Sequence, residues 1–129
     1  MKKSDIINKI HLIISLIIVI PVAIIYGFQP DLEFDIYLDT IDEKNAFKAF
    51  MGLYLGFSLL WILGIIKSKY LRIAIVSNIV FMLGLGIGRL LSLFFDGTPT
   101  SPYIIGVIGE LVLGSYVVWV LKYRLKNSY

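Results

Sequence analysis

The chain has 129 residues, 58% of them hydrophobic, and its mean hydropathy is +0.86. A soluble domain is roughly half apolar and could not bury so much apolar surface, so this composition favours a membrane protein. The chain carries a formal charge of +3 and has no cysteine, which excludes a disulfide framework, a thiol nucleophile and a cysteine-ligated metal site.

Four apolar segments are long enough to cross a bilayer, because a hydrocarbon core about 30 Å thick needs roughly 20 helical residues. In chain order they cover residues 10–28, 46–66, 70–95 and 102–123. They predict an all-α fold: one integral membrane domain over residues 1–129, a four-helix transmembrane bundle in antiparallel up-down-up-down order.

Charged residues are segregated between the connections. Nine of the twelve basic residues lie before the first segment, between the second and third, and after the fourth: Lys2, Lys3, Lys9, Lys67, Lys69, Arg72, Lys122, Arg124 and Lys126. Seven of the nine acidic residues lie in the other two connections: Asp31, Glu33, Asp35, Asp39, Asp42, Glu43 and Asp96. By the positive-inside rule, both termini and the 67–72 loop are expected to face the cytoplasm.

The first outer connection, residues 29–45, alternates apolar Leu32, Phe34, Ile36 and Leu38 with mostly acidic neighbours. A period of two predicts a short extended segment. An isolated strand is marginal, so we expect this segment to pack as a cap over the helices.

The second outer connection is a tight turn. It contains Asp96, Gly97 and Pro99, and it predicts Ser101 as the N-cap and Pro102 as the first residue of the last helix. So short a turn makes helices three and four antiparallel neighbours.

Aromatic side chains near the ends of the segments are typical of a membrane-interface belt. Trp61, Tyr70, Trp119 and Tyr123 fall near the inner ends, and Tyr26, Phe28 and Tyr103 fall near the outer ends.

Two ionisable residues, Arg89 and Glu110, lie inside apolar segments, where an isolated charge costs at least about 2.5 kcal/mol. Helix rise places them roughly 9 and 12 Å from the outer ends of helices three and four, which predicts a buried ion pair in the outer half of the bundle. Helical spacing puts Ser92 and Asp96 on the same face of helix three as Arg89, and Lys48 lies at the outer start of helix two. The resulting candidate polar cluster is Lys48, Arg89, Ser92, Asp96 and Glu110. Such a network either holds the helices in register or forms a binding or proton-linked site.

Glycines at four-residue spacing mark candidate helix-packing faces. They are Gly52 and Gly56, Gly84 and Gly88, and also Gly106 and Gly114, each of which is four residues from Glu110. We favour packing within the bundle over a dimer interface, because four helices supply partners for one another.

The single histidine, His11, lies near the inner end of the first segment without a second ligand in the sequence pattern. We interpret it as an interfacial polar residue and predict no metal and no cofactor. Catalytic signatures and phosphate-binding glycine loops are absent, which favours a non-enzymatic protein, and nucleic-acid motifs are absent too.

Three stretches together resemble a known family. They are Asn45-x-Phe47-Lys48-Ala49-Phe50-x-Gly52-x-x-Leu55-Gly56, then Gly88-Arg89-x-x-Ser92-x-x-x-Asp96-Gly97-x-Pro99, then Glu110. Over roughly residues 40 to 125 the chain resembles the bacterial family called domain of unknown function 4345, in which arginine usually stands where this chain has Lys48. The resemblance implies a small four-helix protein of a bacterial inner membrane with no assigned activity.

Three functions follow as hypotheses. The first is a non-enzymatic structural or partner-binding bundle, which forms a homo-oligomer or binds another membrane protein within the lipid bilayer. The second is a small proton- or cation-coupled transporter that uses Glu110. The third is a protein that binds a lipid or small molecule from the outer side, with Lys48 and Arg89 receiving the headgroup.

Overall fold

The computed structural model describes residues 2–125, which form four α-helices and contain no β-strand. The helices are α1 (Lys3–Phe28), α2 (Ile41–Ile66), α3 (Leu71–Phe95) and α4 (Ser101–Trp119). The short turn η2 (Ser68–Tyr70) leads into α3, and the π-helical turn η3 (Val120–Arg124) continues α4. All four helices of this part of the chain are long and apolar enough to cross a membrane, which confirms the predicted fold class. Lys126, counted above in the last basic block, lies outside the described residues.

The second helix begins at Ile41, before the apolar segment predicted from residue 46. A reciprocal cap starts it: the Thr40 hydroxyl accepts a hydrogen bond from the Glu43 amide at 3.1 Å, and the Glu43 carboxylate accepts one from the Thr40 amide at 2.9 Å. This capping box satisfies two amides of the first turn. Hydropathy locates the apolar span, whereas the backbone helix also includes the charged turn before it.

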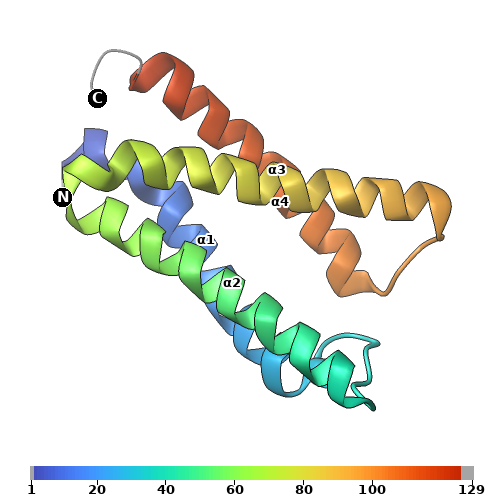
Figure 1. Ribbon diagram of the computed structural model, residues 1–129. Helices are drawn as coiled ribbons and strands as arrows, with labels where there is room; N and C mark the ends of the chain where they lie inside the picture. The colour runs from blue at the N-terminus through green and yellow to red at the C-terminus, as the bar shows by residue number, and fades with distance from the viewer. Residues whose placement is uncertain (1, 126–129) are drawn as a thin grey trace.

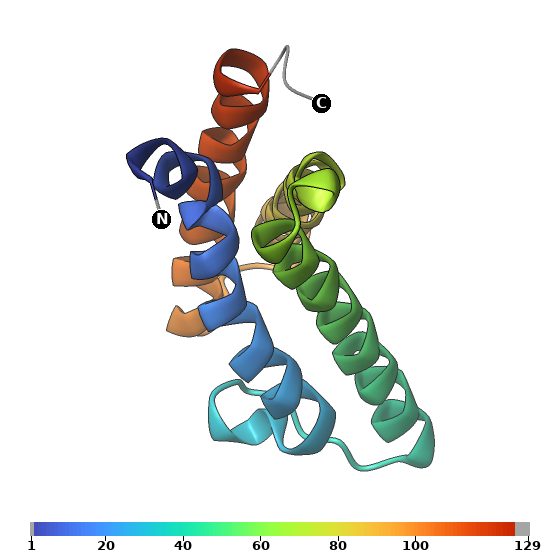
Figure 2. The ribbon, with the colours of Figure 1, turned by 90° about the vertical axis from the view of Figure 1, so that its left-hand side faces the viewer.

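The bundle consists of two antiparallel hairpins, α1 with α2 and α3 with α4, which are joined mainly through α2 and α3. Figure 1 shows both termini and the α2–α3 connection at one end of the molecule, here called the proximal end. Residues 29–40 and the 96–100 turn lie at the opposite, distal end. The hairpins come together at the proximal end and diverge toward the distal end (Figures 1 and 2).

The proximal half holds a closely packed apolar core. Leu12, Trp61, Ile75 and Val117, one from each helix, are all 0% exposed. The Trp61 indole donates a hydrogen bond to the Ser77 hydroxyl at 3.1 Å. The prediction that Trp61 belongs to an interfacial belt is therefore wrong, because its ring faces α3 and not the lipid.

The distal connection forms the cap expected from its pattern. After a short turn, η1 (Pro30–Leu32), the chain has no regular secondary structure over residues 36–39. Phe34 and Ile36 are partly buried against the helices, whereas Tyr37 is 65% exposed and Leu32 is 62% exposed. The alternation thus begins at Phe34, because Leu32 belongs to the preceding turn.

The start of α4 differs by one residue from the prediction. Thr100 has the extended conformation of an N-cap, Ser101 is the first helical residue and Pro102 follows it. Proline fits here as well, because amides in the first turn of a helix have no partner within the helix. Gly97, with φ of 105°, turns the chain between the two helices.

The glycines predicted to pack within the bundle fall into two groups. A side chain added at Gly106 would meet Arg89, and one added at Gly114 would meet Leu83. At the other four positions, Gly52, Gly56, Gly84 and Gly88, an added Cβ would have no atom of another described helix within 4 Å. The preference for intramolecular packing is therefore wrong for α2 and α3, since these glycines lie on outward faces.

Candidate ligand-binding cavity

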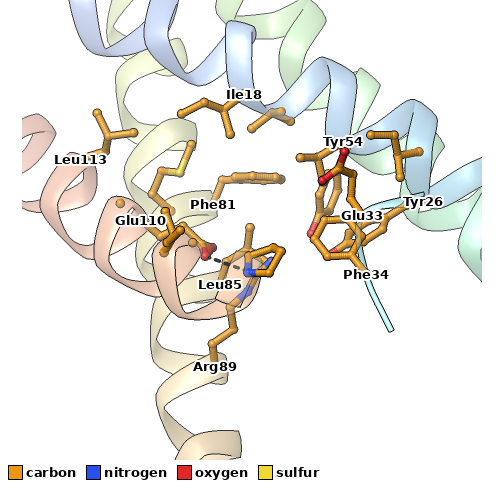
Figure 3. A pocket seen from close by; sticks show the side chains of 18 residues that line it. Ile18, Tyr26, Glu33, Phe34, Tyr54, Phe81, Leu85, Arg89, Glu110 and Leu113 are labelled. Atoms are coloured by element: carbon orange, nitrogen blue, oxygen red, sulfur yellow. Dashed lines mark ion pairs between the residues drawn. The ribbon is translucent and has the colours of Figure 1, made fainter. Parts of the chain in front are cut away.

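A cavity of about 550 Å³ lies where the two hairpins diverge. Figure 3 shows its walls, which come from α1, α3 and α4, with Tyr54 contributed by α2 and with Glu33 and Phe34 contributed by the distal connection. The side chains around it are mostly apolar: Ile18, Val19, Val22, Ile25, Phe81, Met82, Leu85, Ile105 and Leu113. Ligand sites in proteins commonly measure roughly 300–1,000 Å³ and have this apolar character.

The cavity is bordered by α1 on one side and α4 on the other. Ile18 of α1 is 50% exposed and Ile105 of α4 is 69% exposed, although both line the cavity. Because these lining residues are also exposed, we infer that the cavity opens between α1 and α4. Since both helices are membrane-compatible, this opening faces sideways from the bundle.

Arg89 and Glu110 form the ion pair that the sequence predicts. Arg89 Nη1 and Glu110 Oε1 are 3.3 Å apart, and the side chains are 22% and 11% exposed. The antiparallel packing of α3 and α4 brings them to the same depth, and Figure 3 shows the pair at the cavity wall. Gly106 makes the approach possible, because a Cβ there would lie only 2.8 Å from Arg89 Nη1.

The Glu110 carboxylate is the least satisfied polar group of the cavity. The residue is only 9% exposed, and neither of its oxygens accepts a hydrogen bond from residues 2–125. A buried carboxylate normally accepts several hydrogen bonds. Glu110 thus keeps acceptor capacity directed at the cavity beyond its contact with Arg89.

Aromatic residues close the distal end of the cavity. Phe34 of the cap lies between two tyrosines, with ring centroids 5.0 Å from Tyr26 and 4.8 Å from Tyr103. The Tyr26 hydroxyl donates a hydrogen bond to the Tyr103 hydroxyl at 3.2 Å, and the Arg89 guanidinium lies 5.0 Å from the Tyr103 ring centroid. The sequence predicted that these tyrosines belong to an interfacial belt. The only sign of a cap over them was the alternation of apolar and polar residues around Phe34.

The structure divides the predicted polar cluster into three parts. Lys48 donates a hydrogen bond to the Gly27 carbonyl at 3.0 Å and lies over the Phe28 ring, away from the cavity lining. The Ser92 hydroxyl donates to the Asp96 carboxylate at 2.8 Å on an exposed face of α3. Only Arg89 and Glu110 of the five residues line the cavity, because helical spacing fixes depth but not the direction in which each side chain leaves its helix.

A second buried polar cluster lies in the proximal half and is missed by the sequence analysis. His11, Ser15 and Asn78 are each 0% exposed. The Asn78 amide donates to the Ser15 hydroxyl at 3.0 Å, and this hydroxyl donates to the His11 carbonyl at 2.7 Å. His11 is therefore not interfacial as predicted, although its spacing of four from Ser15 was a visible signal. No group of three or more His, Asp or Glu side chains within residues 2–125 gathers closely enough to hold a metal ion.

The fold and the site define a small helical bundle with four membrane-compatible helices and a cavity beside a buried ion pair. The chain belongs to the family described as domain of unknown function (DUF4345), whose model matches residues 7–121. This match includes most of α1, which the resemblance seen in the sequence leaves out. No curated protein and no solved structure shows a significant match.

Proposed function

We propose that this chain is an integral membrane protein that binds an apolar or amphiphilic small molecule, which enters the cavity from the lipid between α1 and α4. The observation that carries the proposal is the cavity of about 550 Å³ with the Arg89–Glu110 pair on its wall. Apolar walls suit a hydrocarbon body, and the pair supplies a polar anchor.

A purely structural role for the pair explains less. A pair that only held α3 and α4 in register would be most stable when covered by close packing, since protein interiors leave few voids larger than a water molecule. Here the carboxylate instead borders a cavity with its acceptor capacity unused within residues 2–125. This combination favours binding over the first hypothesis, a structural bundle.

The transporter hypothesis has less support from the cavity. A carrier requires a route to both ends of the bundle, whereas the cavity residues lie toward the distal half. In the described residues, Leu12, Trp61 and Val117 fill the proximal half. A bound molecule that stays in the distal half is the simpler function for this shape.

The charge pattern orients the proposal in the membrane. Lys67, Lys69 and Arg72 lie at the proximal end, and acidic residues dominate the distal connections. By the positive-inside rule we propose that the proximal end faces the cytoplasm and that the cavity lies in the outer half of the membrane, which the family resemblance suggests is a bacterial inner membrane. The ligand is thus taken from the outer leaflet.

The test is native mass spectrometry of the gently purified protein, with one variant that fills the cavity. Gly109 lines the cavity and has open space where a Cβ would stand, so Gly109→Leu adds side-chain volume to the cavity. We expect wild type to retain a non-protein mass, and Gly109→Leu to weaken its binding by roughly tenfold or more, because overpacking a site costs about 1–3 kcal/mol.

Gly84→Leu is the matched control. Gly84 also has open space at the Cβ position but does not line the cavity. It should retain the same mass as wild type. If wild type and both variants carry no small molecule, or if Gly109→Leu carries as much as Gly84→Leu, the proposal is wrong.

A further inference from the structure

The charges around the cavity restrict the kind of ligand that it can hold. Of the described residues that line it, Arg89 is the one cation, whereas Glu110 and Glu33 both carry carboxylates. Lys48, which could have helped to receive an anion, is bound to the Gly27 carbonyl elsewhere. The lining therefore has a formal charge of −1, and its cation is already paired.

An anionic headgroup fits this arrangement poorly. To reach Arg89 it would come within a few ångströms of Glu110, whose Oε1 is 3.3 Å from Arg89 Nη1. Two like charges at such a distance repel strongly where water is excluded. An ammonium group that approached Glu110 would likewise be repelled by the positive charge of Arg89.

A hydroxyl group satisfies both partners at once. Its O–H can donate a hydrogen bond to an unsatisfied Glu110 oxygen. Its two lone pairs can accept hydrogen bonds from the Arg89 guanidinium. Arginine has five N–H donors, and the ion pair with Glu110 involves only the Nη1 nitrogen of Arg89. Tyr26, whose hydroxyl donates to Tyr103, adds a neutral polar group to the lining.

We infer that the ligand is an uncharged amphiphile with a hydroxyl-bearing polar end, such as a lipid alcohol or an acylglycerol. Its hydroxyl lies beside the pair, within hydrogen-bonding reach of both Arg89 and Glu110, and its hydrocarbon chain runs along Phe81 and Met82 toward the opening. This inference rests on the proposed function and adds the chemical class of the ligand. The pair selects against anionic lipids. In the third hypothesis Lys48 and Arg89 receive the headgroup together, whereas here Arg89 and Glu110 receive it and Lys48 does not take part.

Three probes with the same oleoyl chain test the inference: monooleoylglycerol, oleoyl lysophosphatidic acid and methyl oleate. Each is titrated into the full-length protein in an uncharged detergent, and the bound fraction is measured by native mass spectrometry. We expect monooleoylglycerol to bind roughly tenfold more tightly than either other probe, since one well-made polar interaction contributes about that factor. Methyl oleate lacks a donor for Glu110, and lysophosphatidic acid adds negative charge.

A charge-removing variant sharpens the test. Glu110→Gln keeps the size of the side chain and leaves Arg89 unpaired, so its preference should shift toward lysophosphatidic acid. Gly84→Leu should keep the wild-type order. If Glu110→Gln does not fold, the order of the three probes on wild type still decides the inference.

The outcomes separate the two proposals. Binding of none of the three probes by wild type would overturn the proposed function together with the inference. Binding of lysophosphatidic acid or methyl oleate as tightly as monooleoylglycerol would overturn the hydroxyl inference alone. An unchanged probe preference in folded Glu110→Gln would also overturn it.

Discussion

Arg89 and Glu110 show why a buried charge must be judged with its partner. Each side chain alone would carry an uncompensated charge beside apolar walls, whereas the pair is close to neutral. The pair therefore adds little to stability compared with apolar residues of similar size. Its position beside a cavity fits the proposed binding function better than a purely structural role.

Removing one charge should thus be worse than removing both. Glu110→Leu leaves Arg89 buried without a counter-charge and should lower the free energy of unfolding by about 3–5 kcal/mol. The double variant Arg89→Met/Glu110→Leu should recover most of this loss. Unfolding of the detergent-solubilised protein, followed by circular dichroism, measures both. A double variant less stable than Glu110→Leu alone would contradict this account.

At the scale of the helices, glycines of similar spacing have different roles because they face different neighbours. Gly114 of α4 faces Leu83 of α3 and lets the two helices of the second hairpin approach closely. Gly84 of α3, one residue beyond Leu83, faces open space. Both glycines belong to patterns with four-residue steps, so the sequence does not distinguish them. They differ in whether a neighbouring helix lies against them.

Leucine substitutions should reveal this difference. Gly114→Leu forces the added side chain against Leu83 and should destabilise the bundle by about 1–3 kcal/mol or more. Gly84→Leu adds a side chain on an outward face and should change stability little. Comparing the two unfolding midpoints in the same detergent is the measurement, and equal midpoints would be inconsistent with the packing described here.

For the whole molecule, the charge pattern and the shape agree on one arrangement. The two hairpins pack closely at the end that carries the basic connection, and they diverge at the end that carries the acidic connections (Figure 1). The cavity occupies the divergent half. Orientation in the membrane therefore decides which leaflet can supply the ligand.

Single cysteines test the orientation directly, because the chain has none of its own. Asp35 and Ser68 are exposed at the distal and proximal ends. In intact cells, a membrane-impermeant maleimide should label Asp35→Cys, whereas Ser68→Cys should react only after the membrane is opened. The unsubstituted chain is the unlabelled control. The reverse labelling pattern would invert the topology and place the cavity in the inner leaflet.

The sequence by itself determined the fold class, the apolar part of each of the four helices and the matching level of Arg89 and Glu110 on α3 and α4. These features follow from polarity along the chain and from the fixed rise of a helix, both of which are local. The Arg89–Glu110 contact was also predictable, since the short 96–100 turn makes α3 and α4 neighbours.

Only the tertiary structure decided where the cavity lies and which glycines lie between helices. It also decided that Lys48, Ser92 and Asp96 lie apart from the pair. The burial of His11 and Trp61 was decided in the same way. Each depends on the rotation of a helix about its axis and on the angle between the hairpins. Those quantities are set by side-chain packing between distant parts of the chain, and in a uniformly apolar helix no polar face reveals them. The ion pair could thus be predicted from the sequence, and the space beside it could not.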